Sequence, residues 1–85
     1  MESTSFLQFK ITEDDKRLIR NIRCYKKTVL RIDFNIFGKS LLKRIVNTFD
    51  LDLYDIQETV NELKLYIFSA DCWYDKKRNT LFKVN

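Results

Sequence analysis

Hydrophobic and polar residues alternate with a period of two in two segments of the chain, residues 6–11 and 28–37. In the first segment, Leu7, Phe9 and Ile11 alternate with polar residues. The second segment alternates in the same way at Leu30, Ile32, Phe34 and Ile36. Because successive side chains of a strand point to opposite faces, this pattern predicts two strands, each with one buried face.

Between these strands the apolar residues recur at steps of three and four, which predicts a helix over residues 12–27. Thr12 is the expected N-cap, with Asp15 as its partner in a capping box. The expected core-facing residues are Leu18, Ile19, Ile22 and Tyr25.

Two further helices are predicted after Gly38. Ser40 is expected to cap a helix that ends near Phe49, and Asp52 to cap a third helix after a short break. The stripe of the third helix is Leu53, Ile56, Val60, Leu63 and Ile67. An alternative interpretation makes residues 51–60 and 63–70 strands, since Leu63, Leu65 and Ile67 also alternate.

The last segment, residues 72–84, predicts a β-hairpin in which aromatic and β-branched residues flank a charged tip. The expected order is therefore strand, helix, strand, helix, helix, strand, strand. This is an α+β fold of winged-helix-like architecture in a single domain of residues 1–85. The alternative strand assignment gives instead an α+β two-layer fold with two helices on an antiparallel sheet.

The joint between the second and third helices resembles the helix-turn-helix of winged-helix DNA-binding domains. The apolar positions that carry this resemblance are Ile45, Val46, Phe49, Leu51, Ile56, Val60 and Leu63. Family turns often have Gly where this chain has Asp50, and Ala where it has Val46. Asp tolerates left-handed backbone better than most residues, so the turn remains feasible.

The resemblance implies binding of double-stranded DNA by a small regulator of transcription. The third helix would enter the major groove, with Gln57 and Asn61 as adenine readers. The hairpin tip would place Lys76, Lys77 and Arg78 on phosphates. The structural alternative for this tip is a solvated, charged turn that blocks edge pairing.

The predicted first helix adds a basic stripe, because Lys16, Arg20, Arg23 and Lys27 fall at steps of four, three and four. Such a face is either solvated or meets an anionic partner. The predicted third helix has the opposite character on its outward face. Its protein-binding candidates are Tyr54, Asp55, Glu58, Glu62 and Leu65.

Carboxylates repel a phosphate-lined groove, and this face therefore suits a protein surface better than a duplex. The alternative function is a protein-binding inhibitor or adaptor of the kind that viruses and mobile elements encode. A homodimer is compatible with either function.

The net charge of +4 and the pI of about 9.2 permit anionic partners without requiring them. With no His, the chain lacks the usual general base and a complete zinc ligand set, so we expect no enzyme activity, no metal and no cofactor. Cys24 and Cys72 are expected to be small buried hydrophobes rather than a disulfide. Residues 1–4 lack the features of a signal peptide, and no apolar run could span a membrane, which favours a cytoplasmic protein.

Overall fold

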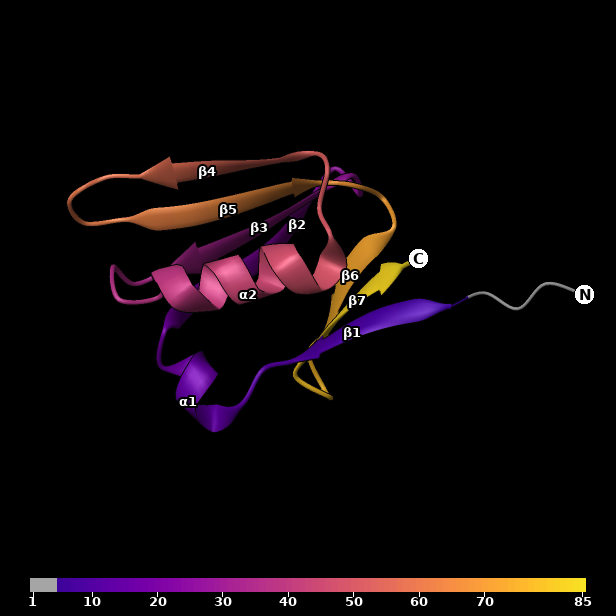
Figure 1. Ribbon diagram of the computed structural model, residues 1–85, viewed down its shortest axis with the longest axis horizontal. Coiled ribbons are helices and arrows are strands. Elements are labelled where there is room, and N and C mark those ends of the chain that lie inside the picture. Colours follow the sequence, from indigo (N-terminus) through magenta and orange to yellow (C-terminus); the bar gives the residue numbers. More distant parts are fainter. Residues whose placement is uncertain (1–4) are drawn as a thin grey trace, which may run out of the picture.

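In the computed structural model, which describes residues 5–85, seven strands and two helices form two antiparallel sheets. The elements in chain order are β1 (Phe6–Lys10), α1 (Glu13–Lys16), β2 (Ile19–Tyr25), β3 (Val29–Phe34), α2 (Lys39–Phe49), β4 (Tyr54–Glu58), β5 (Leu63–Phe68), β6 (Cys72–Asp75) and β7 (Thr80–Val84). Sheet A has the order β1-β7-β6, and sheet B has the order β2-β3-β5-β4 (Figure 1).

The winged-helix prediction is wrong. Of the described residues 47% lie in strands and 19% in helices, and no third helix follows α2 within residues 5–85. The alternative with two helices on an antiparallel sheet is wrong as well, because α1 is a single turn of four residues. Its two strands are nevertheless present as β4 and β5, which pair antiparallel.

The predicted first helix fails because a β-bulge imitates the helical period. Thr12 does form the expected capping box with Asp15, but α1 ends at Lys16 and β2 follows. The register of β2 on β3 shifts between Ile19 and Asn21, which inserts one residue into the strand. Ile19 and Ile22 therefore both lie opposite buried residues of β3, although they are three positions apart.

The predicted third helix fails because a tight turn between two strands also produces steps of three and four. Val60 lies in the β4–β5 turn and is 86% exposed, so it is not a core residue. Asp52 caps no helix. On β5 the side chains of Leu63, Leu65 and Ile67 point inward and are buried, as the alternating interpretation requires.

Helix α2 matches its predicted extent and ends at Phe49 as expected, but its N-cap differs. Gly38 is the N-cap and Ser40 lies inside the first turn, with no side-chain cap. At the C-terminus Asp50 adopts left-handed backbone with φ of 47°, and Leu51 N–H donates to the carbonyl of Val46. This is a Schellman-type ending, and Asp50 serves it in the place that Gly usually takes.

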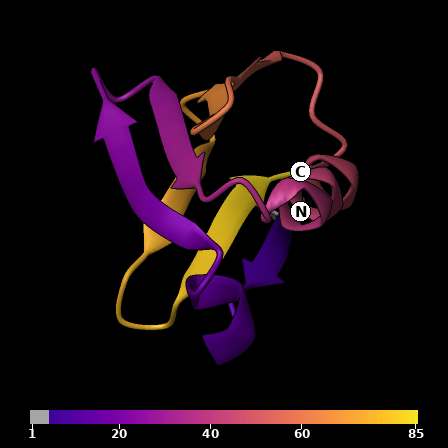
Figure 2. The same ribbon diagram turned by 90° about the vertical axis from the view of Figure 1, so that its left-hand side faces the viewer.

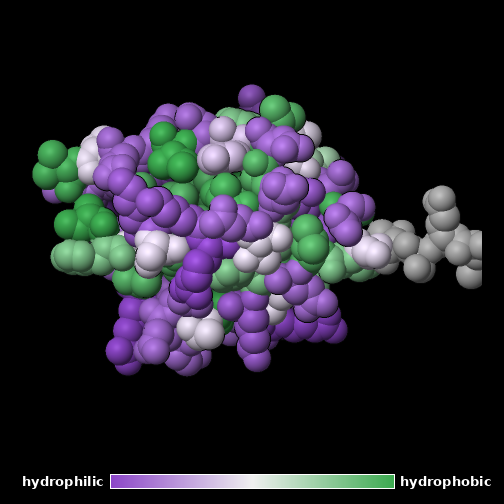
Figure 3. Space-filling view, in the orientation of Figure 1, coloured by the Kyte–Doolittle hydropathy of each residue, from purple (hydrophilic) through white to green (hydrophobic). Residues whose placement is uncertain are grey.

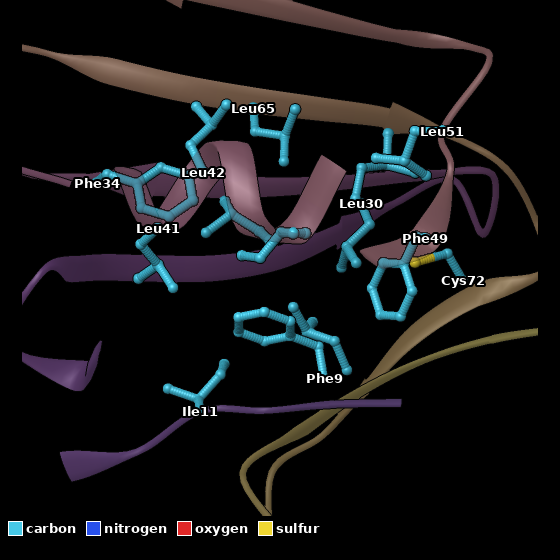
Figure 4. Close-up of a cluster of buried hydrophobic side chains, with 14 of the residues drawn as sticks. Phe9, Ile11, Leu30, Phe34, Leu41, Leu42, Phe49, Leu51, Leu65 and Cys72 are labelled. Carbon is cyan, nitrogen blue, oxygen red and sulfur yellow. The ribbon is translucent and has the colours of Figure 1, made fainter. Parts of the chain in front are cut away.

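The core lies between the two sheets, and α2 closes one open side of the space between them (Figure 2). Figure 4 shows Phe9 from sheet A, Leu30 and Leu65 from sheet B, and Phe49 from α2 converging there. All four are buried. Each sheet therefore keeps one outer face in contact with solvent.

The two cysteines have different surroundings, and neither forms a disulfide. Cys72 is buried, as expected, whereas Cys24 is exposed near the end of β2, so that part of the prediction is wrong. In residues 5–85 no helix is long and apolar enough to cross a membrane. The expectation about a signal peptide concerns residues 1–4, which lie outside the described residues.

Candidate nucleic-acid interface

Three aromatic rings gather on the outer face of sheet A, one from each strand. We call Phe6, Trp73 and Phe82 the aromatic cluster. The rings of Trp73 and Phe82 are stacked, with centroids 5.5 Å apart and planes 17° apart. Phe6 meets Trp73 edge to face at 5.7 Å. Phe6 is 50% exposed and Trp73 39% exposed, so the cluster offers open ring surface to solvent.

The alternation of the strands explains why these rings point outward. Their neighbours on the same strands, Phe9 on β1, Cys72 on β6 and Leu81 on β7, are buried against the core. The register places Trp73 directly opposite Phe82. Because side chains directly opposite one another in an antiparallel pair lie close together, this register fixes the stacked pair.

A basic hairpin tip lies at one end of the aromatic cluster. The sequence correctly predicts this hairpin, with Lys76, Lys77 and Arg78 in the turn between β6 and β7. Asp75 Oδ1 accepts hydrogen bonds from the backbone N–H groups of Lys77 at 3.0 Å and Arg78 at 3.3 Å. The turn backbone is therefore held in place, while the three cationic side chains are exposed.

The tip is further fixed to the body of the protein through Asn79. Asn79 has left-handed backbone with φ of 49°, and its carbonyl accepts a hydrogen bond from Ile11 N–H at 2.7 Å. Its side-chain oxygen accepts a hydrogen bond from the hydroxyl of Tyr74 at 3.2 Å. These contacts hold the cations of the tip next to the end of β1.

Between the tip and the start of α1 lies an open groove of about 770 Å³. Its lining residues are Lys10, Ile11, Thr12, Glu13, Lys77, Arg78, Asn79 and Thr80. Lys10 and Thr80 are opposite one another on β1 and β7, two residues along the strands from the Gln8–Phe82 pair and therefore on the same face of sheet A. The groove is thus continuous with the face that carries the aromatic cluster.

Two acidic side chains at the groove and the tip form ion pairs with cations. Glu13 forms an ion pair with Lys16 at 3.3 Å, and Asp75 forms one with Arg78 at 3.7 Å. Lys76 and Lys77 form no ion pair with any described residue. The groove therefore retains positive charge that is available to an anion.

The predicted basic stripe of the first helix does not exist. Lys16 ends α1, Arg20 lies at the bulge of β2, Arg23 lies farther along β2 and Lys27 lies in the β2–β3 turn. The steps of four, three and four align side chains only on a helix. On the strand that forms here, these cations are not a single row.

The predicted base readers and protein anchors also lie on strands. Gln57 lies on β4, where its side-chain oxygen accepts a hydrogen bond from Tyr66 at 3.4 Å, and Asn61 lies in the β4–β5 turn. Gln57 belongs to sheet B and Asn61 to a turn between two of its strands, whereas the basic tip connects two strands of sheet A.

Of the protein-binding candidates, Tyr54, Asp55 and Glu58 are exposed on β4, and Glu62 is exposed in the turn. Asp55 lies on the opposite face of the strand from the other two. Leu65 is 0% exposed, so it is a core residue and not a surface anchor.

The aromatic cluster was not predicted from the sequence, although the sequence contains a signal for the pair Trp73–Phe82. A four-residue tip at Lys76–Asn79 makes Asp75 and Thr80 opposite partners, and counting outward then pairs Trp73 with Phe82. Phe6 could not be added in this way, because its place beside Trp73 depends on how β1 docks on β7.

No group of His, Cys, Asp and Glu side chains within residues 5–85 is arranged to hold a metal ion. No protein-family model, curated protein or solved structure matches this chain. The functional argument therefore depends on the geometry and chemistry of the chain itself.

Proposed function

We propose that this protein binds single-stranded nucleic acid on the outer face of sheet A. The bases stack on the aromatic cluster, and the phosphates contact the basic tip and the adjoining groove. The observation that carries the proposal is the stacked pair of the exposed Trp73 and the half-buried Phe82, two residues along the strands from Lys10 and Thr80 at the groove. Aromatic platforms beside a positive groove are the combination by which proteins bind single strands.

The arrangement favours a single strand over a duplex. A base can lie flat on Trp73 or Phe6 only if it is unpaired and unstacked, because the bases of a duplex already stack on one another. Reading a major groove requires a protruding helix or ribbon, and residues 54–58, predicted to start a recognition helix, form an edge strand of sheet B. In this proposal, binding of a single strand on sheet A therefore replaces the binding of a duplex that the winged-helix resemblance implies.

The charge distribution supports the same proposal. The net charge is +4, and Lys10, Lys77 and Arg78 lie at the groove while the aromatic cluster itself carries no charge. Stacking does not discriminate strongly among bases, since each has a π-face. We therefore expect modest sequence preference and a pronounced dependence of affinity on salt concentration.

Trp73 is the only Trp of the chain, so its fluorescence reports directly on the proposed site. The experiment titrates the protein at low salt with DNA and RNA single strands of about eight nucleotides. We expect quenching that saturates, with weaker quenching by a duplex of the same length. Absence of any quenching or binding by either single strand at low salt would refute the proposal.

A matched pair of variants separates stacking from general electrostatic attraction. Phe6→Leu removes a ring of the aromatic cluster, whereas Phe68→Leu removes a ring with similar exposure, 44%, on sheet B. Loss of one stacking ring should weaken binding at least about fivefold in Phe6→Leu and leave Phe68→Leu close to the parent. Equal affinities for the two variants would place the bases elsewhere. Circular dichroism verifies that both variants are folded.

A further inference from the structure

Strand β4 forms one edge of sheet B, and every residue in it is exposed. The neighbouring strand β5 forms hydrogen bonds with the backbone groups of only every second residue of β4. The carbonyl of Leu53 accepts from Phe68 N–H at 3.0 Å, and Thr59 N–H donates to the carbonyl of Glu62 at 2.8 Å. Because hydrogen-bonded positions alternate along an antiparallel strand, the backbone groups of every second residue point away from β5. These residues are Tyr54, Ile56 and Glu58.

The other sheet edges of residues 5–85 carry features that hinder pairing with another chain. The β2 edge is distorted by its bulge near Arg20 and is lined by cations. In sheet A, β1 lies against α2, and β6 is only four residues long. Strand β4 has a regular register on β5 and contains no Pro, Lys or bulge. Apart from the carboxylates Asp55 and Glu58, β4 has none of these protective features, and such edges are sites for the addition of a further strand.

An apolar groove of about 250 Å³ accompanies this edge, between β4 and α2. It is lined by Leu42, Lys43, Val46, Asn47, Tyr54 and Ile56. Tyr54 and Ile56 are 39% and 41% exposed, so a neighbouring strand would cover apolar area as well as backbone groups. Figure 3 shows hydrophobic residues exposed between hydrophilic ones on the face that carries α2 and β4.

We propose that β4 pairs antiparallel with β4 of a second copy of this chain, with Ile56 opposite Ile56 on the two-fold axis. In this register all outward N–H and C=O groups of Tyr54, Ile56 and Glu58 find partners in the second copy. Tyr54 lies opposite Glu58, and Asp55 opposite Gln57, so that no like charges face each other.

Other registers of the same two strands are less complementary. Centring the pair on Asp55 opposes the two Asp55 carboxylates, and centring it on Glu58 opposes the two Glu58 carboxylates. Centring it on Gln57 places the charged Glu58 opposite Ile56 and leaves outward backbone groups of Tyr54 unpaired. The sequence of β4 is therefore self-complementary in the register that has Ile56 at its centre.

The charges of the groove support a second copy as the occupant. Glu58 of the second copy would lie opposite Tyr54, whose side chain lines the groove together with Lys43. Glu58 already forms an ion pair with Lys39 of its own chain at 3.3 Å. In the dimer each Glu58 would therefore lie between Lys39 of its own chain and Lys43 of the other copy. The resulting assembly doubles the four-stranded sheet B and leaves the aromatic cluster on sheet A uncovered.

Sedimentation equilibrium over a range of protein concentrations tests the proposal. We expect reversible dimerisation of the parent with a Kd of about 10–100 µM, as suits a small interface. Ile56→Lys places charges against each other on the two-fold axis and should leave only monomer. Ile36→Lys changes an isoleucine of similar exposure, 50%, away from β4 and should dimerise like the parent. A parent that stays monomeric throughout, or equal weakening by both variants, would overturn the proposal.

Disulfide trapping tests the register. In a Cys24→Ser background, Ile56→Cys should give a covalent dimer on mild oxidation, because paired Cα atoms near 5.5 Å apart lie within disulfide range. Val60→Cys is the control, since in this register the two Val60 residues lie roughly 26 Å apart along the strands. Cross-linking of Val60→Cys that equals or exceeds that of Ile56→Cys would contradict the register. Cys72 is buried and does not interfere.

Discussion

Arg44 Nη2 donates a hydrogen bond to Asp15 Oδ1 at 2.8 Å, joining two residues that are 29 positions apart in the chain. The other oxygen of Asp15 accepts a hydrogen bond from Thr12 N–H at 3.2 Å, so one carboxylate caps α1 and ties it to α2. The Arg44 guanidinium also lies over the ring of Phe9, 5.7 Å from its centroid. This contact fixes the start of β2 relative to the helix that closes the core.

Removing the charge of Asp15 should destabilise the protein at neutral pH. Asp15 is only 6% exposed, and Arg44 would lose its charge-assisted hydrogen bond to the carboxylate. We expect Asp15→Asn to lower the free energy of unfolding by about 1–3 kcal/mol in urea at pH 7. Asp14→Asn, which changes an exposed carboxylate of the same turn, is the control and should have a much smaller effect.

The same pair predicts an acid-sensitive contribution to stability. Burial acts to raise the pKa of Asp15, but hydrogen bonds from Arg44 and Thr12 outweigh it and hold the pKa below its ordinary value. A depressed pKa stabilises the fold above the unfolded-state pKa of about 4, and this contribution is lost as pH falls through the folded-state pKa. The stability difference between the parent and Asp15→Asn should therefore shrink below about pH 4. A difference that is constant with pH would contradict this explanation.

Gly38 should not tolerate a side chain. A Cβ atom at this position would lie 2.9 Å from Phe34 Cβ and 3.2 Å from the carbonyl oxygen of Leu18. We expect Gly38→Ala to cost roughly 1–3 kcal/mol of unfolding free energy, measured by chemical denaturation. Ser40→Ala is the control, because Ser40 makes no capping hydrogen bond, and it should stay within about 0.5 kcal/mol of the parent.

The two thiols should differ sharply in reactivity. Burial raises the pKa of Cys72 to about 11, whereas Cys24 is exposed at the end of β2. Iodoacetamide at mildly alkaline pH should therefore add one label to the native protein, at Cys24, as read by mass spectrometry. Cys24→Ser should remain unlabelled until it is denatured. Labelling of native Cys24→Ser would show that sheet A opens readily.

Cations of the groove should set the salt dependence of nucleic-acid binding. If Lys10, Lys77 and Arg78 each contact a phosphate, the logarithmic slope of affinity against salt is about −2 for a single strand. Lys77→Gln should reduce the steepness of this slope by about 0.7. Lys43→Gln removes an exposed cation on α2 and should leave the slope unchanged. Equal slopes for all three proteins would remove Lys77 from the interface.

Local patterns predicted part of this fold because local interactions decide those parts. The alternation at residues 6–11 and 28–37 identified β1 and β3, and the charged tip identified the β6–β7 hairpin. The capping box at Thr12 formed as expected. The predicted length of the helix that follows Thr12 was wrong, since the capping signal specifies where a helix begins and not where it ends. The bulge at Ile19–Asn21 then gave a strand the spacing of a helix.

The sequence by itself determined which short segments alternate, where the chain turns and which residues cap α1. Only the tertiary structure decided that β1 docks on β7, which brings Phe6 to Trp73, and that β4 remains an edge. Periodicity records which side chains share a face, but it does not record which strand lies beside which. That choice depends on burying Leu65, Phe49 and Phe9 in one common core, a property of the whole chain rather than of any segment.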